Sequence, residues 1–294
     1  MARKTSSRFV FGLAVPENLT ALDASVGALI RWIGTKAGLE LVRFQVPSYE
    51  ALARQMSDGA LHVAWLPPIV FVRLERDGVA TALVASRRGG SAGYESVLLV
   101  RASSKIHTLD GLRGARAAWV DPLSAAGYVL PRIQLAALGI DPRGFFGVEH
   151  FCGSHAAAVR AVLDGEADVA ATFAGLDRDG AVVRGGWTEQ PEGHLAMRVL
   201  ATFGEIPPDL IAVRNDVSPQ IQRVLASAFT AACRDETMGP IIKRVFGVDA
   251  FAKEGFASYD GLRRTIDAAA ERGLLDLSVV HSSRLPTRPP RAQD

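Results

Sequence analysis

The sequence contains little cysteine and no excess of charge of either sign. Its 294 residues include only Cys152 and Cys233, far apart in the chain, so no disulfide framework is expected and the redox compartment stays open. Lysine and arginine number 33 against 31 aspartates and glutamates, a net charge of +2. Because no basic block lies in the body of the chain, the sequence lacks the electrostatic field that attracts nucleic acid. We therefore expect no nucleic-acid partner.

Long hydrophobic runs are also missing. No stretch approaches the length needed to span a membrane, and the N-terminal apolar run FVFGLAV has seven residues before Pro16-Glu17-Asn18. No small-residue cleavage pattern follows it, so we interpret the run as a first buried strand rather than a secretion signal. The sequence thus predicts a cytoplasmic protein, with a periplasmic location as the alternative if a leader was removed before this numbering.

Two common catalytic motifs are absent as well. The chain has no Walker-type phosphate loop and no zinc-protease helix. His150, Cys152 and His155 stand close enough together to suggest a metal site, but they lack a clear fourth ligand. We therefore expect neither a metal nor another cofactor.

What the sequence does contain is an alternation of strand and helix patterns, in a chain long enough for two domains. Apolar runs bounded by turn residues predict strands, and amphipathic segments with capping residues predict helices. The predicted strands are 8–15, 39–46, 61–66, 79–86, 95–101, 116–120, 146–151, 167–173, 197–203 and 210–214. The predicted helices are 19–38, 48–59, 69–77, 108–114, 125–138, 154–166, 218–235, 237–246, 249–253 and 260–272.

The α/β pattern restarts after Ser103, which predicts two lobes. The first is expected to comprise residues 1–102 and 203–283, the second residues 103–202, and 284–294 form a flexible tail. Insertion of one lobe into the other gives two crossings, near 101–104 and 202–205, and two crossings make a hinge. Ligands of open α/β sheets bind beyond the carboxyl ends of strands. The turns of interest are therefore those after Val15, Trp65, Val120, Phe151 and Phe173.

Three segments carry a resemblance to a known family. They are 109-LDGLRGARAAWVDPLSAAGYVLPRIQL-135, 139-GIDPRGFFGVEHFCGSHAAAVRAVLDGEADVAAT-172 and 205-EIPPDLIAVRND-216. With their Asp-Pro, Gly-Ser-His and Ile-Pro-x-Asp turns in order, they resemble the phosphate/phosphite/phosphonate-binding proteins of ABC transporters, over most of residues 8–275. The resemblance implies a two-lobed type II periplasmic-binding-protein fold that closes on a small ligand.

In that family the turn after Asp-Pro usually reads Ser-Thr-Ser-Gly, and its hydroxyl and N–H groups hold the phosphonate. The matching residues here are Ser124, Ala125, Ala126 and Gly127, so two hydroxyl donors are missing. A hydrogen bond to a charged group contributes about 1.5–3 kcal/mol, so their loss favours a bulkier or less charged ligand. The backbone N–H groups remain, because they do not depend on the side chain.

The resemblance also marks residues on other turns. His155 matches the family's ligand-contacting histidine, although a histidine there can also simply cap its own helix, and we expect Ser154 to be the N-cap. Asp209 aligns with an aspartate that meets an amino group on some ligands; the alternative is a turn aspartate after Pro207-Pro208. Asp177 is a weaker candidate from the turn that often completes such sites.

Two aromatic residues are candidates from the first lobe and the cleft rim. Trp65 matches a family segment that lines the cleft, but a tryptophan after Val63-Ala64 is as often simply core. Tyr94 matches a tyrosine at the rim, and Tyr128 is expected to pack beneath its helix.

Two functions remain open from the sequence. The first is a monomeric solute-binding protein that closes on a small anionic or zwitterionic molecule for transport or sensing, with an ABC permease or a signalling protein as partner. The second is a cytosolic enzyme on the same fold, similar to chorismate dehydratase. An acid–base pair of His155 with Asp209 or Asp177 would favour the enzyme, whereas a cleft lined by donors alone would favour binding.

Overall fold

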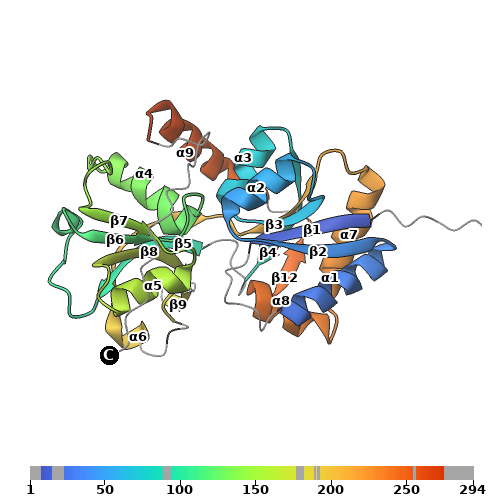
Figure 1. Cartoon of the computed structure of the whole chain (residues 1–294), viewed down its shortest axis with the longest axis horizontal. Coiled ribbons are helices and arrows are strands. Elements are labelled where there is room, and N and C mark those ends of the chain that lie inside the picture. Colours follow the sequence, from blue (N-terminus) through green and yellow to red (C-terminus); the bar gives the residue numbers. More distant parts are fainter. Residues whose placement is uncertain are drawn as a thin grey trace, which may run out of the picture.

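The computed structural model describes residues 8–14, 23–88, 94–176, 182–188, 190, 193–253 and 256–274. Asp177 and the predicted tail at 284–294 lie outside the described residues. Within these ranges the chain forms two mixed β-sheets, each with helices packed against it, in two lobes side by side (Figure 1). No helix of the described part is long and apolar enough to cross a membrane.

The first sheet has six strands, of which three run parallel at one end. β1 pairs in parallel with β2 and β3, and β11 joins antiparallel between β3 and β4. In spatial order the strands are β12 (Ala250–Ala252), β4 (Ala80–Arg87), β11 (Leu210–Arg214), β3 (Val63–Leu66), β1 (Arg8–Ala14) and β2 (Glu40–Val46). Runs such as VAWL and LIAVR are apolar at nearly every position because helices cover both faces of this sheet.

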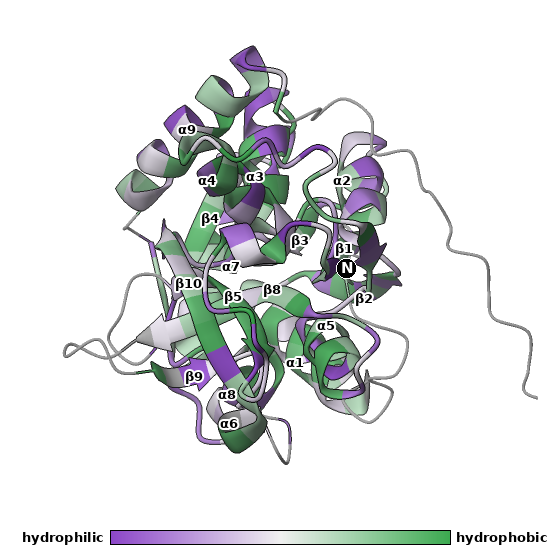
Figure 2. Cartoon of the chain, turned by 90° about the vertical axis from the view of Figure 1, so that its left-hand side faces the viewer, coloured by the Kyte–Doolittle hydropathy of each residue, from purple (hydrophilic) through white to green (hydrophobic). Residues whose placement is uncertain are grey.

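Two groups of helices cover the first sheet. One face carries α2 (Tyr49–Ser57), α3 (Pro68–Arg76) and α9 (Tyr259–Glu271), the last preceded by a 3-10 turn, η4 (Phe256–Ser258). The other face carries α1 (Asp23–Ala37), α7 (Pro219–Ala232) and α8 (Met238–Phe246). α9 alternates hydrophilic and hydrophobic residues along its length (Figure 2), and its apolar side is buried.

The second sheet is mixed: β5 runs antiparallel to both of its neighbours, β10 and β8, whereas β6 runs parallel to β8 and β7. Its strands in spatial order are β10 (Met197–Ile206), β5 (Tyr94–Arg101), β8 (Val169–Leu176), β6 (Arg116–Trp119) and β7 (Val148–Phe151), with β9 (Val182–Gly185) paired to β8. Its helical segments are η2 (Asp110–Leu112), the π-helical turn η3 (Ala125–Val129), α4 (Leu130–Ala137), α5 (His155–Leu163) and α6 (Gly193–Ala196).

The lobe boundaries differ from the sequence prediction. Residues 95–101 were expected in the first lobe, but β5 pairs with β8 and β10 in the second sheet. The crossings therefore lie between Arg87 and Tyr94 and between Ile206 and Leu210, rather than near 101–104 and 202–205. The strand's core, VLLV, is buried at every position, and such a run carries no sign of which sheet it joins.

The prediction of a helix at 249–253 was wrong. Residues Ala250–Ala252 form the edge strand β12, which pairs antiparallel with β4. Phe251 is buried against the rings of Trp65 and Phe229, and this packing decides the conformation of a three-residue segment that has no periodicity of its own. The sequence also gave no prediction for β9 and α6.

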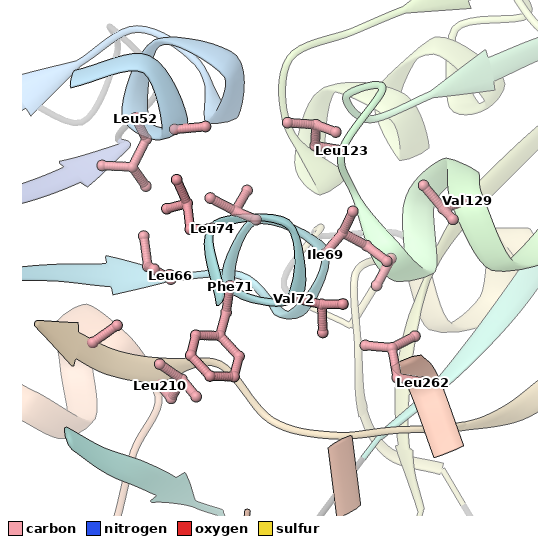
Figure 3. Close-up of a cluster of buried hydrophobic side chains, with 14 of the residues drawn as sticks. Leu52, Leu66, Ile69, Phe71, Val72, Leu74, Leu123, Val129, Leu210 and Leu262 are labelled. Atoms are coloured by element: carbon pink, nitrogen blue, oxygen red, sulfur yellow. The ribbon is translucent and has the colours of Figure 1, made fainter. Parts of the chain in front are cut away.

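A continuous apolar cluster joins the two lobes. Leu123 and Val129 from the second lobe face Ile69 on α3 of the first lobe, and Leu262 of α9 lies beside them (Figure 3). All four side chains are at most 5 % exposed. The lobes are therefore in direct contact, next to the turn that the family resemblance assigns to the ligand.

Candidate ligand site

The turn after β6 is a π-helical turn, η3, that runs directly into α4. Ser124 is its N-cap: the Gly127 N–H donates to Ser124 Oγ at 3.0 Å. The Val129 N–H bonds to the Ser124 carbonyl, and the Val120 N–H to that of Gly127. A π-turn inside a longer helix is a geometry often found at functional sites. The predicted helix at 125–138 is confirmed, and its first turn is π-helical, wider than an α-helical turn.

Gly127 is fixed by close packing. A Cβ at this position would overlap the side chain of Val120 and lie 2.8 Å from Ser124 Oγ. Only glycine allows the turn to press against the end of β6, which is why the family's final glycine is retained beside two changed residues.

Two backbone N–H groups of the first turn are left for a ligand. Among the described residues, the N–H groups of Ala125 and Ala126 have no hydrogen-bond partner, and both residues are at most 3 % exposed. The first N–H groups of any helix lack intrahelical acceptors and carry the positive end of the helix dipole. Buried away from water, such groups require an acceptor, and an anionic oxygen is the best one.

His155 is the first residue of α5, with Ser154 as the N-cap, as predicted. Its Nδ1 lies 2.9 Å from Thr172 Oγ1, and its ring meets Phe173 edge-on at 5.0 Å. Burial, assisted by the positive charge of Arg184, lowers the pKa of His155 from 6.5 to about 4. The imidazole is therefore neutral at neutral pH, and because Nδ1 is hydrogen-bonded to the threonine hydroxyl, Nε2 is the ring nitrogen left for a ligand.

Contacts connect His155 to the η3 turn. Phe173 on β8 stands opposite Ser96 on β5, and the Ser96 hydroxyl donates to the Ala126 carbonyl at 2.8 Å. Ser96, Thr172, Ser124 and Ser86 are the four buried serine or threonine side chains of the described residues. Each is hydrogen-bonded to a component of this region. The buried serine and threonine hydroxyls of the described residues are thus all bonded to groups of the candidate site.

Asp209 is held in an ion pair. Its Oδ2 lies 2.8 Å from Nη2 of Arg88, which also donates to the Phe246 carbonyl. The Asp209 carbonyl accepts from the backbone and hydroxyl of Ser86, and the Tyr259 hydroxyl donates to the neighbouring Pro208 carbonyl. The aspartate is thus a fixed, partly buried carboxylate whose charge is matched by Arg88.

Tyrosines occupy the space around this ion pair. The ring of Tyr94, the residue predicted for the cleft rim, lies 6.1 Å from that of Phe173. Burial raises the pKa of Tyr94, Tyr49 and Tyr259, and the negative charge of Asp209 acts in the same direction on all three. These hydroxyl groups therefore stay protonated and serve as neutral donors.

Trp65 was predicted either to line the cleft or to pack in the core, and it packs at the edge of the core beside Arg88. Its ring stacks on Phe246 at 4.6 Å and touches the periphery of the first lobe's core. The Arg88 guanidinium lies 5.9 Å above the same ring. Trp65 thus packs against the Arg88 side of the Arg88–Asp209 ion pair. Tyr128, as expected, packs beneath its helix against Trp119 and Phe151.

Tyr49 was not among the predicted site residues, because the turn after β2 that positions it was not a predicted ligand turn. Ser48 caps α2 there, and Tyr49 is the helix's first residue. The carboxylate of Asp121, from the second lobe, accepts from the N–H groups of Leu123 and Tyr49, while burial raises the pKa of Asp121. The available signal was the strand-to-helix turn Val46–Tyr49, of the same kind as the turns that were considered.

The acid–base pair that would favour an enzyme is not formed by the described residues. His155 is partnered by Thr172, and Asp209 by Arg88; Asp177 lies outside the described residues. No three histidine, cysteine, aspartate or glutamate side chains in the described ranges stand close enough to hold a metal ion. What the geometry offers is a set of neutral hydrogen-bonding groups: two backbone N–H groups of η3, the imidazole of His155 and tyrosine hydroxyls.

Comparisons with known proteins identify the family and the fold. Residues 11–254 match the family model described as the periplasmic substrate-binding protein of phosphonate ABC transporters. The phosphate-import protein PhnD of Mycolicibacterium smegmatis is 24 % identical over 271 residues, which cover 86 % of this chain and 84 % of the relative.

Solved structures show the fold. A binding protein component of an ABC phosphonate transporter from Pseudomonas aeruginosa superposes with a TM-score of 0.75 at 18 % identity, covering 94 % of this chain and 91 % of the other. PhnD1 of Prochlorococcus marinus, solved with methylphosphonate, gives a TM-score of 0.72 at 17 % identity, with coverages of 91 % and 99 %. The two-lobed type II periplasmic-binding-protein fold is thus confirmed. Because the family model matches most of its length, the chain belongs to the family of periplasmic substrate-binding proteins of phosphonate ABC transporters.

Proposed function

We propose that this protein captures a small phosphonate or phosphate anion between its lobes and delivers it to an ABC permease. The observation that carries the proposal is the pair of buried, unpartnered N–H groups at Ala125 and Ala126, counted among the described residues. His155 supplies a neutral donor nearby, and Tyr49 and Tyr94 supply hydroxyl groups. Family membership supports the same ligand class and the permease as partner.

The proposed permease partner implies a cellular location for the protein. A transporter's binding protein meets its permease outside the cytoplasmic membrane, and the family description names the periplasm. The cytoplasmic prediction is not confirmed, and the family supports the periplasmic alternative. Fractionation of host cells, with detection of the protein in the periplasmic extract, tests this; recovery in the cytoplasm alone would contradict it.

The alanines set the expected strength of binding. With two hydroxyl donors replaced by methyl groups, backbone N–H groups and His155 carry the anion, and each charged hydrogen bond contributes about 1.5–3 kcal/mol. We propose that selectivity for a bare phosphonate is relaxed relative to a Ser-Thr-Ser turn, in favour of ligands with a further group to bind.

Titration calorimetry with methylphosphonate and with inorganic phosphate tests the proposed function. We expect one molecule bound per chain, and at least about tenfold weaker binding in His155→Ala, since one charged hydrogen bond is lost. His107→Ala is the matched control, because His107 is exposed. Absence of binding by the folded wild-type protein, or equal binding by the two variants, would contradict the proposal.

A further inference from the structure

The ion pair at Asp209 changes what the site can recognise at its far end. The resemblance to the family assigns an aspartate at this position to a ligand's amino group. Here the Asp209 carboxylate is already paired with Arg88 at 2.8 Å, and both side chains are less than a quarter exposed. A ligand ammonium group would have to displace a guanidinium that is partly buried, lies over the Trp65 ring and is bonded to the Phe246 carbonyl.

Arg88 also has a donor to spare. Its Nε is buried and, among the described residues, has no hydrogen-bond partner. A guanidinium presents five N–H groups in a fixed fork that matches a carboxylate or phosphoryl group. The Nη2 atom is used by Asp209 and Phe246, so the orphaned Nε–H is the donor that calls for an oxygen.

A chain of contacts connects Arg88 to the η3 and His155 end of the site, where the phosphonate is proposed to bind. Two aromatic rings separate them: Phe173 touches His155, and Tyr94 touches Phe173. Tyr94 in turn lies within the electrostatic reach of Asp209 and Arg88. A second guanidinium, that of Arg184, crosses from the second lobe to Gly247, the neighbour of Phe246.

We propose that the ligand carries a second anionic group, a carboxylate or a second phosphoryl group, which binds Arg88 at the end of the site opposite η3. The inference rests on the proposed function, which places the first anionic group at Ala125 and Ala126. It replaces the ammonium-binding aspartate with an anion-binding arginine and assigns the protein to dianionic, short-chain ligands. The relaxed η3 turn is consistent with affinity shared between two ends.

Calorimetry with three phosphonates of similar length separates the possibilities. Methylphosphonate has no second group, 2-aminoethylphosphonate has an ammonium group, and 2-carboxyethylphosphonate has a carboxylate. We expect the carboxylate ligand to bind at least about tenfold more tightly than the ammonium ligand. Equal or tighter binding of 2-aminoethylphosphonate would overturn the inference while leaving the proposed function intact. Failure of all three to bind would instead reject the proposed function.

The variant Arg88→Gln tests whether Arg88 causes the preference for a ligand carboxylate over an ammonium group. We expect it to weaken 2-carboxyethylphosphonate at least about tenfold, to change methylphosphonate less than about threefold, and to favour the ammonium ligand, because Asp209 is then free. Arg87→Gln, one residue earlier on the opposite face of the strand, is the control. If Arg88→Gln fails to fold, the ligand ranking of the wild-type protein still decides, and a ranking unchanged in folded Arg88→Gln would overturn the inference.

Discussion

Three hydroxyl side chains at the site already make hydrogen bonds within the protein. Ser124 caps its own turn, Ser96 anchors the Ala126 carbonyl and Thr172 orients His155. Only the Ser124 hydroxyl is at a position where the family resemblance expects a donor to the anion, and its oxygen already accepts from the Gly127 N–H. What remains for the ligand is backbone, an imidazole and tyrosine hydroxyls, so side chains at Ala125 and Ala126 should control affinity directly.

Restoring hydroxyls at those two positions should therefore tighten binding. In Ala125→Thr/Ala126→Ser we expect at least about a tenfold gain in affinity for methylphosphonate, because even one charged hydrogen bond is worth about 1.5 kcal/mol. Calorimetry measures it, and Ala137→Ser on the exposed last turn of α4 is the control. Tight binding by the unmodified protein, with no gain in the double variant, would show that the alanines have no effect on affinity.

The neutral imidazole of His155 makes a second prediction, about stability. Its folded pKa is about 4, against an ordinary value of 6.5. Between these values the unfolded chain binds a proton that the folded protein does not. Stability should therefore fall as pH drops from about 6.5 to about 4, by up to about 3 kcal/mol from this group. Urea unfolding at several pH values measures the slope, and His155→Asn should reduce it. An identical slope in the variant would contradict the assignment.

At the level of elements, the η3 turn depends on one close approach. The end of β6 and the first turn of the π-helix touch through Val120 and Gly127, and the N–H groups of Ala125 and Ala126 are positioned by that contact. An element placed this way tolerates changes of side chain at its surface but not an added atom at its base.

Gly127→Ala should accordingly destabilise the protein. The new Cβ would overlap Val120 inside a packed core, and overpacking costs about 1–3 kcal/mol. Gly261→Ala is the matched control: its Cβ would meet no atom within 4 Å, and alanine is the better helix former by about 1 kcal/mol. Urea midpoints should move in opposite directions. A neutral Gly127→Ala would mean that the turn is not held by this contact.

The sequence predicts those elements that are marked by nearby residues. Ser48, Ser154 and the turns after Val120 and Phe151 were readable because caps and strand ends are marked by residue type. The lobe of β5 and the strand at β12 were not readable, since both depend on distant partners: β8 in one case, Trp65 and Phe229 in the other. The Arg88–Asp209 pair joins residues 121 positions apart, and no spacing rule indicates it.

At the level of the whole molecule, the two lobes are in direct contact. The contact has an apolar part, around Leu123 and Ile69, and a polar part, where the Asp121 carboxylate meets the Tyr49 N–H at the start of α2. α9 belongs to the same cluster through Leu262 and lies on the same side of the molecule as α3 and α4 (Figure 1). These contacts stabilise the arrangement of the lobes in this structure, and we expect a ligand bound between the lobes to stabilise it further.

Weakening the apolar part should open the molecule and make closure depend on ligand. Leu123, 2 % exposed in the closed state, becomes solvated if the lobes separate, so Leu123→Asp should favour the open state, in which the carboxylate reaches water. Small-angle scattering should show a larger radius of gyration for the ligand-free variant than for the wild type, and compaction when a bound phosphonate draws the lobes together. Leu138→Asp on the same lobe, where the leucine is 61 % exposed, should change neither. An unchanged radius in Leu123→Asp, with and without bound ligand, would show that the lobes do not move about the two crossings.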